Sequence, residues 1–161
     1  MLKIVKESIV NMDVDAVVNA ANEFLVGGGG VDGAIHHSAG PQLDKACREI
    51  GHCDTGEAVI TSGFNMKCKY IIHTVGPIYF KHSKEENKEL LSSCYKNSIE
   101  LALKIGIKSI AFPCISCGVY GYPLKEACAV AIDTCKKYQD KLDIYLVCFS
   151  DNELDVYNQM I

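Results

Sequence analysis

The chain has 161 residues, of which 48% are hydrophobic and 22% charged, a composition typical of globular proteins that excludes wholesale disorder. The length predicts a single domain over residues 1–161. The formal net charge of −4 argues against the broad basic surface that duplex nucleic acid requires, so a nucleic-acid partner is not expected. No apolar run reaches membrane-spanning length and the N-terminus lacks the apolar core of a secretory signal; together these features predict a cytoplasmic protein with no membrane partner.

Strand-like and helix-like segments alternate along the chain. Short runs rich in Val, Ile, Tyr and Phe predict strands at residues 2–5, 16–18, 58–61, 70–75, 109–112 and 143–149. Apolar residues at a helical period predict helices at residues 31–39, 43–50, 91–102, 124–138 and 154–160. Ser83 and Glu86 offer a capping box to the third of these helices. The alternation predicts an α/β fold with helices on both faces of a sheet, and ligands of such sheets lie at the carboxyl ends of the strands.

The segment after the second strand carries the strongest functional signal. It reads Asn19-Ala20-Ala21-Asn22 and continues, after four residues, as Gly27-Gly28-Gly29-Gly30-Val31-Asp32-Gly33-Ala34-Ile35-His36. Consecutive glycines allow the backbone to approach a ligand closely. They lead directly into a helix N-terminus, where free N–H groups and the helix dipole favour phosphate. The order is neither GxGxxG nor a Walker loop, which disfavours a nucleotide hydrolase and leaves an anion-binding loop as the prediction.

A second loop of small residues follows the strand at residues 109–112 and reads Pro113-Cys114-Ile115-Ser116-Cys117-Gly118-Val119-Tyr120-Gly121-Tyr122-Pro123. Alone it is indistinguishable from an ordinary glycine turn. Two such loops at one sheet edge, however, can hold the two phosphates of a diphosphate from opposite sides.

The cysteines and histidines suggest structural roles. Nine cysteines in a chain without a secretory signal predict free thiols. The lone CxxC of Cys114 and Cys117 is a weak metal signal, because structural zinc takes four ligands, and neither a metal nor another cofactor is expected. His36 and His73 are expected to be hydrogen-bonded structural residues. Asn19 is expected to bond its own backbone in the turn after its strand.

The motifs VNAAN, GGGGVDGAIH and ISCGVYGYP, in this order, resemble the MacroD-type branch of the macrodomain family. The resemblance spans residues 15–149. It implies a three-layer α/β/α fold with a mixed, mostly parallel central sheet, and ADP-ribose as the ligand. It also implies binding roles for Ser8, Ile9, Asn19, Ala20, Gly28, Gly29, Gly30, Val31, Ser116, Cys117, Gly118, Val119, Tyr120 and Phe149.

The resemblance implies two catalytic residues. Asn22 would hydrogen-bond the distal ribose, and Asp32 would orient or deprotonate an attacking water. A carboxylate is a weak base at neutral pH, so Asp32 is expected mainly to position water, with the ligand's own phosphate assisting. A helix-capping role for Asp32 is an alternative that is compatible with catalysis.

Two positions depart from the family's pattern. Glu7-Ser8-Ile9-Val10 stands where the family usually has Gly-Asp-Ile-Thr, so the carboxylate expected to accept a bond from adenine is replaced by the Ser8 hydroxyl. A neutral bond is worth less than a charge-assisted one, which predicts weaker adenine recognition. Cys117 stands where many relatives have Thr, and its thiol near a helix N-terminus is a candidate for oxidation.

Three functions are compatible with these residues. The first is an enzyme that hydrolyses the ester between mono-ADP-ribose and Asp or Glu side chains of modified proteins and deacetylates O-acetyl-ADP-ribose. The second is a reader module that binds ADP-ribose without cleaving it. The third, binding of RNA or poly(ADP-ribose), is disfavoured by the net charge. Asp32 favours the enzyme, because a reader has no need of it for catalysis.

Overall fold

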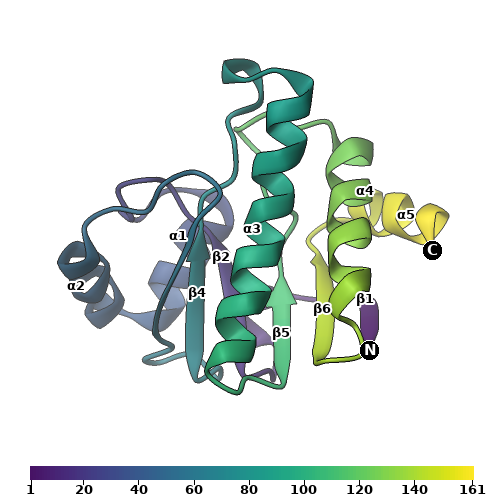
Figure 1. Cartoon of the computed structure of the whole chain (residues 1–161). Helices are drawn as coiled ribbons and strands as arrows, with labels where there is room; N and C mark the ends of the chain where they lie inside the picture. The colour runs from purple at the N-terminus through teal and green to yellow at the C-terminus, as the bar shows by residue number, and fades with distance from the viewer.

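The computed structural model describes the whole chain, Met1–Ile161, and contains one sheet of six strands in the order β1-β6-β5-β2-β4-β3 (Figure 1). The β3–β4 pair is antiparallel and every other pair is parallel. The sheet is therefore mixed and mostly parallel, as predicted. The strands are β1 Leu2–Lys6, β2 Ala16–Ala20, β3 Ala58–Ser62, β4 Tyr70–Thr74, β5 Ser109–Phe112 and β6 Asp143–Cys148.

Each predicted helix is present, with shifted ends. The helices are α1 Gly30–Ala39, α2 Pro41–Ile50, α3 Lys84–Lys104, α4 Leu124–Cys135 and α5 Asp151–Met160. Both halves of the predicted capping box between Ser83 and Glu86 are formed at the start of α3. The helix α5 begins three residues before the predicted start at 154, because the Ser150 hydroxyl accepts a bond from the amide of Glu153. No helix combines the length and apolar character that membrane crossing requires.

Three short 3₁₀ helices also occur. Two were not predicted, Ile9–Asn11 and Tyr79–Lys81, whereas the third, Lys136–Tyr138, follows α4 and lies within the helix predicted over residues 124–138. Each has three residues, too few for a period to be visible in the sequence.

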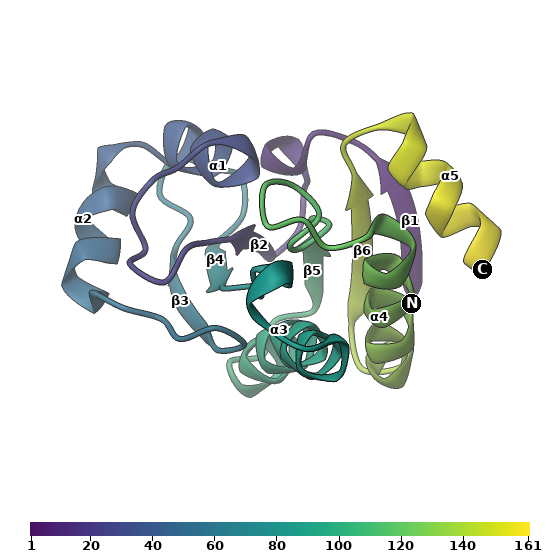
Figure 2. The ribbon, with the colours of Figure 1, turned by 90° about the horizontal axis from the view of Figure 1, so that it is seen from above.

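The sheet has a hydrophobic core on each face. Along β2, Ala16 and Val18 belong to a core of 24 buried residues shared with α3 and α4, whereas Val17 belongs to a core of 16 buried residues shared with α1 and α2. Alternate residues of a strand point to opposite faces, so a continuously apolar strand is buried on both. Figure 2 shows α3 and α4 on one side of the sheet and α1 on the other. The predicted three-layer α/β/α arrangement is confirmed.

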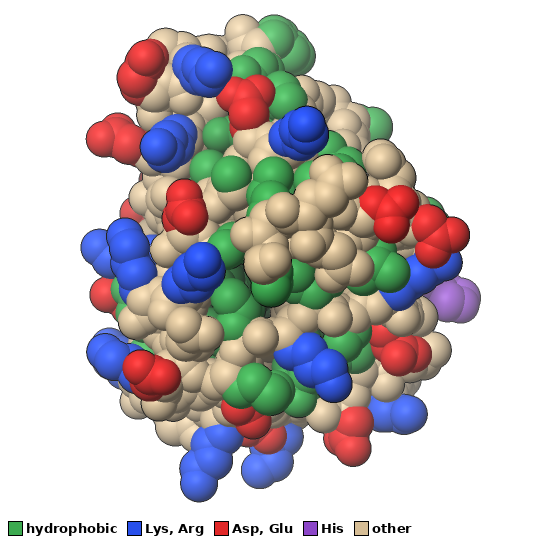
Figure 3. All heavy atoms as spheres, turned by 90° about the vertical axis from the view of Figure 1, so that its right-hand side faces the viewer, with side chains coloured by type: hydrophobic (Ala, Val, Ile, Leu, Met, Phe, Trp, Pro, Cys, Tyr) green, Lys and Arg blue, Asp and Glu red, His purple; other side chains and the backbone are tan.

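The outer edge at β1 is covered by α5, which packs on β1 and α4. Figure 3 shows the side of the molecule that carries α4 and α5. Basic and acidic side chains are mixed on it and no continuous basic patch is seen.

Four adjacent parallel strands, β1, β6, β5 and β2, end at the same edge of the sheet. The loops that leave these ends are far apart in the sequence but meet above the sheet, where Figure 2 looks down on them. The loop after β2 contains the glycines and the loop after β5 contains the CxxC segment. This edge is where open α/β sheets place their ligands.

Candidate functional site

A cavity of about 970 Å³ lies at this edge. It is formed by the four loops that follow β1, β2, β5 and β6, and its volume is at the upper end of the range for small-molecule sites. Every residue predicted to bind or react lines it, except Asn19. The predicted residues in its wall are Ser8, Ile9, Ala20, Asn22, Gly28, Gly29, Gly30, Val31, Asp32, Ser116, Cys117, Gly118, Val119, Tyr120 and Phe149.

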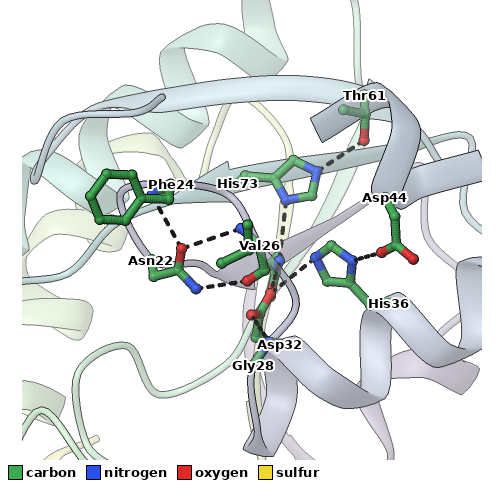
Figure 4. Close-up of polar contacts among 10 residues, drawn as sticks. Asn22, Phe24, Val26, Gly28, Asp32, His36, Asp44, Thr61 and His73 are labelled. Carbon is green, nitrogen blue, oxygen red and sulfur yellow. Dashed lines mark hydrogen bonds and ion pairs between the residues drawn. The ribbon is translucent and has the colours of Figure 1, made fainter. Parts of the chain in front are cut away.

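Asn22 shapes the glycine-rich loop. Its side-chain amide donates to the carbonyl of Val26 at 2.7 Å, and its oxygen accepts from the amides of Phe24 at 3.1 Å and Val26 at 3.3 Å (Figure 4). A Cβ added at Gly28 would lie 4.0 Å from Asn22 Nδ2 and 3.3 Å from Asp32 Oδ2. The two predicted catalytic side chains therefore flank Gly28, and a larger residue there would crowd both.

Asp32 lies in the first turn of α1 and is only 7% exposed. Its Oδ2 accepts from the amide of Gly28 at 2.7 Å, and its Oδ1 accepts from Asn19 Nδ2 at 2.8 Å. His36 Nε2 lies 3.3 Å from the same Oδ1. The carboxylate does not make the helix-capping bond considered from the sequence, because the N-cap of α1 is Gly29 and has no side-chain partner. It instead ties the first turn of α1 to Gly28 in the preceding loop, and it lines the cavity. The donors of Gly28 and Asn19 hold this carboxylate in a fixed position, from which it can orient a water.

Asn19 corrects two expectations. It was expected to bond its own backbone after the strand, and the resemblance implied a ligand contact. Instead β2 extends through it to Ala20, its side chain is fully buried, and it does not line the cavity. Its side-chain amide donates to Asp32 Oδ1 and faces His73 Nδ1 at 3.1 Å. The prediction was wrong because the strand was ended too early, at Val18, which left Asn19 in a turn that does not exist.

Both histidines are structural, as predicted. His36 Nδ1 lies 2.6 Å from Asp44 Oδ1, so this imidazole joins α2 to Asp32. His73 is fully buried in β4, and its Nε2 lies 2.9 Å from Thr61 Oγ1 of β3. Burial, assisted by the charge on His36, lowers the pKa of His73 to about 3. The His73 imidazole is therefore neutral at physiological pH.

The loop after β5 presents its backbone to the cavity through an unusual conformation. Ser116 has φ +67°, and its hydroxyl donates to the carbonyl of Pro77 at 2.9 Å. This approach depends on Gly76, where an added Cβ would lie 2.0 Å from Ser116 Oγ. The amide of Tyr79 donates to the carbonyl of Tyr120 at 2.9 Å, which fixes the far end of the loop. The loop is therefore held at both ends while Val119, at its tip, is fully exposed.

Tyr120 brings a phenol into the cavity wall. Burial, together with the negative charges of Glu23 and Asp32, raises the pKa of Tyr120 above its ordinary value. The hydroxyl stays protonated at neutral pH and is available as a hydrogen-bond donor.

The expectation of free thiols was wrong for one pair. Cys114 and Cys117 form a disulfide, and both line the cavity on either side of Ser116. The other seven cysteines are free and buried, as the sequence predicted. A count of cysteines cannot distinguish the two cases, because proximity within this loop is set by the turn at Ser116.

Ser8, Ile9 and Phe149 form the end of the cavity next to β1 and β6. The Ser8 side chain is exposed and makes no capping bond, whereas Ile9 is buried. The Phe149 ring is 84% exposed, and its amide donates to Glu153 Oε1 at 2.9 Å. Glu153 also lines the cavity and was not predicted. It lies on α5, and only the capped start of that helix brings it back to the site.

Other cavity residues were also missed, because their side chains are small or apolar: Val10, Ala21, Ala34, Gly76, Pro113, Ile115 and Val147. A separate group of metal-ligating side chains, Glu23, His52 and Asp54, has its ligand atoms within 4.8 Å of one another. All three are exposed, His52 Nε2 pairs with Asp54 Oδ1 at 2.7 Å, and none lines the cavity.

This geometry defines an α/β protein with an anion-binding cavity made mainly of backbone at the carboxyl edge of its sheet. Comparison with known proteins agrees: the Macro domain family matches residues 18–131, and the chain belongs to that family. The chain is 50% identical to a Macro domain-containing protein of Chlorobaculum tepidum over 100% of this chain and 95% of that protein.

One further comparison supports the MacroD-type branch, and another supports the fold. The chain is 47% identical to ADP-ribose glycohydrolase MACROD2 of Xenopus laevis, covering 97% of this chain but 38% of that longer protein. Its fold matches a mutant of the Oceanobacillus iheyensis macrodomain with ADPR at a TM-score of 0.94 and 43% identity, over 98% of this chain and 90% of that one.

The buried neutral His73 makes stability depend on pH. In the unfolded chain His73 is protonated below its ordinary pKa of 6.5, whereas in the folded chain it stays neutral down to about pH 3. The free energy of unfolding therefore falls as the pH decreases from about 6.5 to 3. We expect His73 to contribute up to about 1.4 kcal/mol per pH unit. Urea unfolding at pH 7, 6, 5 and 4 should show a shallower dependence for His73→Gln than for wild type. The exposed His37 supplies the control, and an equally shallow profile for His37→Gln would contradict the assignment.

Proposed function

We propose that this protein is an ADP-ribose hydrolase that releases mono-ADP-ribose from esters with Asp and Glu side chains and deacetylates O-acetyl-ADP-ribose. The observation that carries the proposal is the pairing of the Asn22 amide and the Asp32 carboxylate over Gly28 in the cavity wall. Support comes from the relatives named ADP-ribose glycohydrolase and from the Oceanobacillus iheyensis structure with ADPR.

Backbone groups account for diphosphate binding in an acidic protein. The segment Gly28–Gly30 enters the N-terminus of α1, and the segment Ser116–Tyr120 lies across the cavity from it. Amides of both loops would donate to the two phosphates, and the dipole of α1 would add a favourable field. The Tyr120 phenol and the Asn22 amide would contact the distal ribose, and the exposed Phe149 ring would stack on adenine.

The reaction requires one water and no other reactant. Water attacks either the acyl carbon, which breaks the bond from that carbon to the ribose oxygen, or the anomeric carbon, which breaks its bond to the ester oxygen. Either route yields ADP-ribose, a free carboxylate and a proton. The cavity-facing side of Asp32 would orient this water, since the Gly28 and Asn19 bonds hold the carboxylate in place. The proton is passed to solvent or to the ligand's phosphate. The donors in the two loops would stabilise the charge that develops.

The reader function needs a separate argument, because Asp32 also has a structural role. Its bonds to Gly28 and Asn19 hold the glycine-rich loop against β2, and a protein that only binds ADP-ribose would benefit from them equally. The presence of Asp32 therefore does not by itself separate enzyme from reader. Turnover has to be measured.

The deciding experiment is release of ADP-ribose from a Glu-modified mono-ADP-ribosylated protein by wild type, Asp32→Asn and Asp32→Ala. We expect wild type to turn over and both variants to lose about 10²–10⁴-fold in kcat, the usual contribution of one acid–base or water-orienting group. Calorimetry with ADP-ribose is the control: Asp32→Asn keeps the side-chain shape and one of the two acceptors that serve Gly28 and Asn19, so it should lose less binding than Asp32→Ala. Wild type that binds ADP-ribose but releases none would establish a reader.

Ser8→Asp should tighten ADP-ribose binding. A carboxylate at this exposed position in the cavity wall can accept a charge-assisted bond from the adenine amino group, which is worth roughly 1 kcal/mol more than a bond to a neutral hydroxyl. We expect a decrease in Kd of about fivefold by calorimetry. Ser8→Asn, which adds a neutral acceptor of the same size, is the matched control. Equal Kd values for wild type and Ser8→Asp would show that Ser8 does not contact adenine.

The Cys114–Cys117 disulfide should strengthen binding, because it restrains the loop whose amides meet the phosphates. A reduced loop has to be ordered on binding, at a cost of about 0.5–1.5 kcal/mol. We therefore expect the Kd for ADP-ribose to rise about two- to tenfold after reduction with a dithiol. The Cys114→Ser/Cys117→Ser protein should have the Kd of reduced wild type, and the reductant should not change this Kd. A wild-type Kd that is the same in both redox states rules out the effect.

A further inference from the structure

A chain of buried side chains leads from the outer strand β3 to the cavity wall. Thr61 Oγ1 lies 2.9 Å from His73 Nε2, and Asn19 Nδ2 lies 3.1 Å from His73 Nδ1. The chain ends where Asn19 Nδ2 donates to Asp32 Oδ1 at 2.8 Å. Figure 4 labels Thr61, His73 and Asp32 of this chain. Asn19 and His73 are fully buried, and Thr61 is 8% exposed. None of these three side chains lines the cavity.

The direction of every bond in this chain follows from its two ends. Asp32 carries only acceptors when ionised, so Asn19 has to present its NH₂ group, whose second hydrogen points at His73 Nδ1. His73 Nδ1 must then be an acceptor, which puts the proton of the neutral ring on Nε2, where it donates to Thr61 Oγ1. The Thr61 hydroxyl in turn donates to the carbonyl of Ser62 at 3.1 Å.

The side-chain amide of Asn19 could also adopt the orientation in which its oxygen and nitrogen are exchanged. The hydrogen-bond directions given above exclude this orientation as long as the His73 proton is on Nε2. Asn19 Oδ1 has no hydrogen-bond partner, so a half-turn of the amide would bring this oxygen to His73. If the His73 proton were on Nδ1, it would donate a hydrogen bond to Asn19 Oδ1 in this turned orientation. The same turn would place an oxygen against the Asp32 carboxylate and remove its donor. The tautomer of His73 therefore determines whether Asn19 presents its NH₂ group or its oxygen to the Asp32 carboxylate.

We propose that Thr61 and His73 are positioning residues for hydrolysis: they select the orientation of Asn19 and thereby hold the Asp32 carboxylate in the position from which it orients water. This inference rests on the proposed function. Neither residue lines the cavity, and the Gly28 bond still anchors the glycine-rich loop to Asp32 without them, so we expect their contribution mainly in the chemical step. Gly28 and His36 hold Asp32 from other sides, which makes the loss of the chain a partial effect.

The test compares Thr61→Val with Thr61→Ser. Valine keeps the shape of threonine but removes the acceptor for His73 Nε2–H, whereas serine keeps the hydroxyl. We expect Thr61→Val to move the His73 proton toward Nδ1, seen in ¹⁵N NMR of the imidazole, and to lower kcat about tenfold with the Kd for ADP-ribose unchanged. Thr61→Ser should match wild type in all three measurements.

Several results would overturn the proposal. The first is a wild-type His73 protonated on Nδ1, which needs no variant and stands even if Thr61→Val does not fold. The others are an unchanged kcat in Thr61→Val, with or without a change of tautomer, and a loss of kcat in Thr61→Ser equal to that in Thr61→Val. Failure of the proposed function looks different, because wild type itself would release no ADP-ribose; the role in hydrolysis then falls with it.

Discussion

The bond between the Asp32 carboxylate and the Gly28 amide, backed by the donor of Asn19, is the interaction on which the site depends. It joins the first turn of α1 to the glycine-rich loop that precedes it and to the strand β2 beneath it. Four consecutive glycines have many accessible conformations, and a flexible loop would lose much entropy on binding a ligand. Anchoring this loop at Gly28 from below lets it present its amides without closing the cavity above.

The loop after β5 is also restrained, but by other contacts than the glycine-rich loop. Its backbone is held by the Ser116 bond to Pro77, by the close approach to Gly76 and by a disulfide, and none of these contacts uses the amides that face the cavity. An anion site built from amides needs no cationic side chains. A chain of net charge −4 could therefore bind an anion in this cavity without a basic surface.

The polar interior below the site is unusual in an otherwise apolar core. Asn19 and His73 occupy positions in β2 and β4 whose neighbours are fully buried Val18 and Ile72. Polar groups buried in a sheet are costly unless they are paired. Here the Asn19 NH₂ group pairs with His73 and Asp32, whereas Asn19 Oδ1 has no partner. Together with His36, which reaches Asp44 of α2, they connect three elements to one carboxylate.

Much of the fold and most of the cavity wall were predictable from sequence, because they depend on local features. Apolar runs of five residues, helical periods and a capping box each act over a few neighbours, and the two loops are recognisable by residue order. What the structure decided were side-chain pairings: Cys114 with Cys117 and Glu153 with Phe149 through the local turns after β5 and β6, and Asn19 with Asp32 and His73 between more distant parts of the chain. Such pairings depend on which strands lie side by side and where each one ends, and a shift of two residues at the end of β2 changes Asn19 from a turn residue into the support of the site.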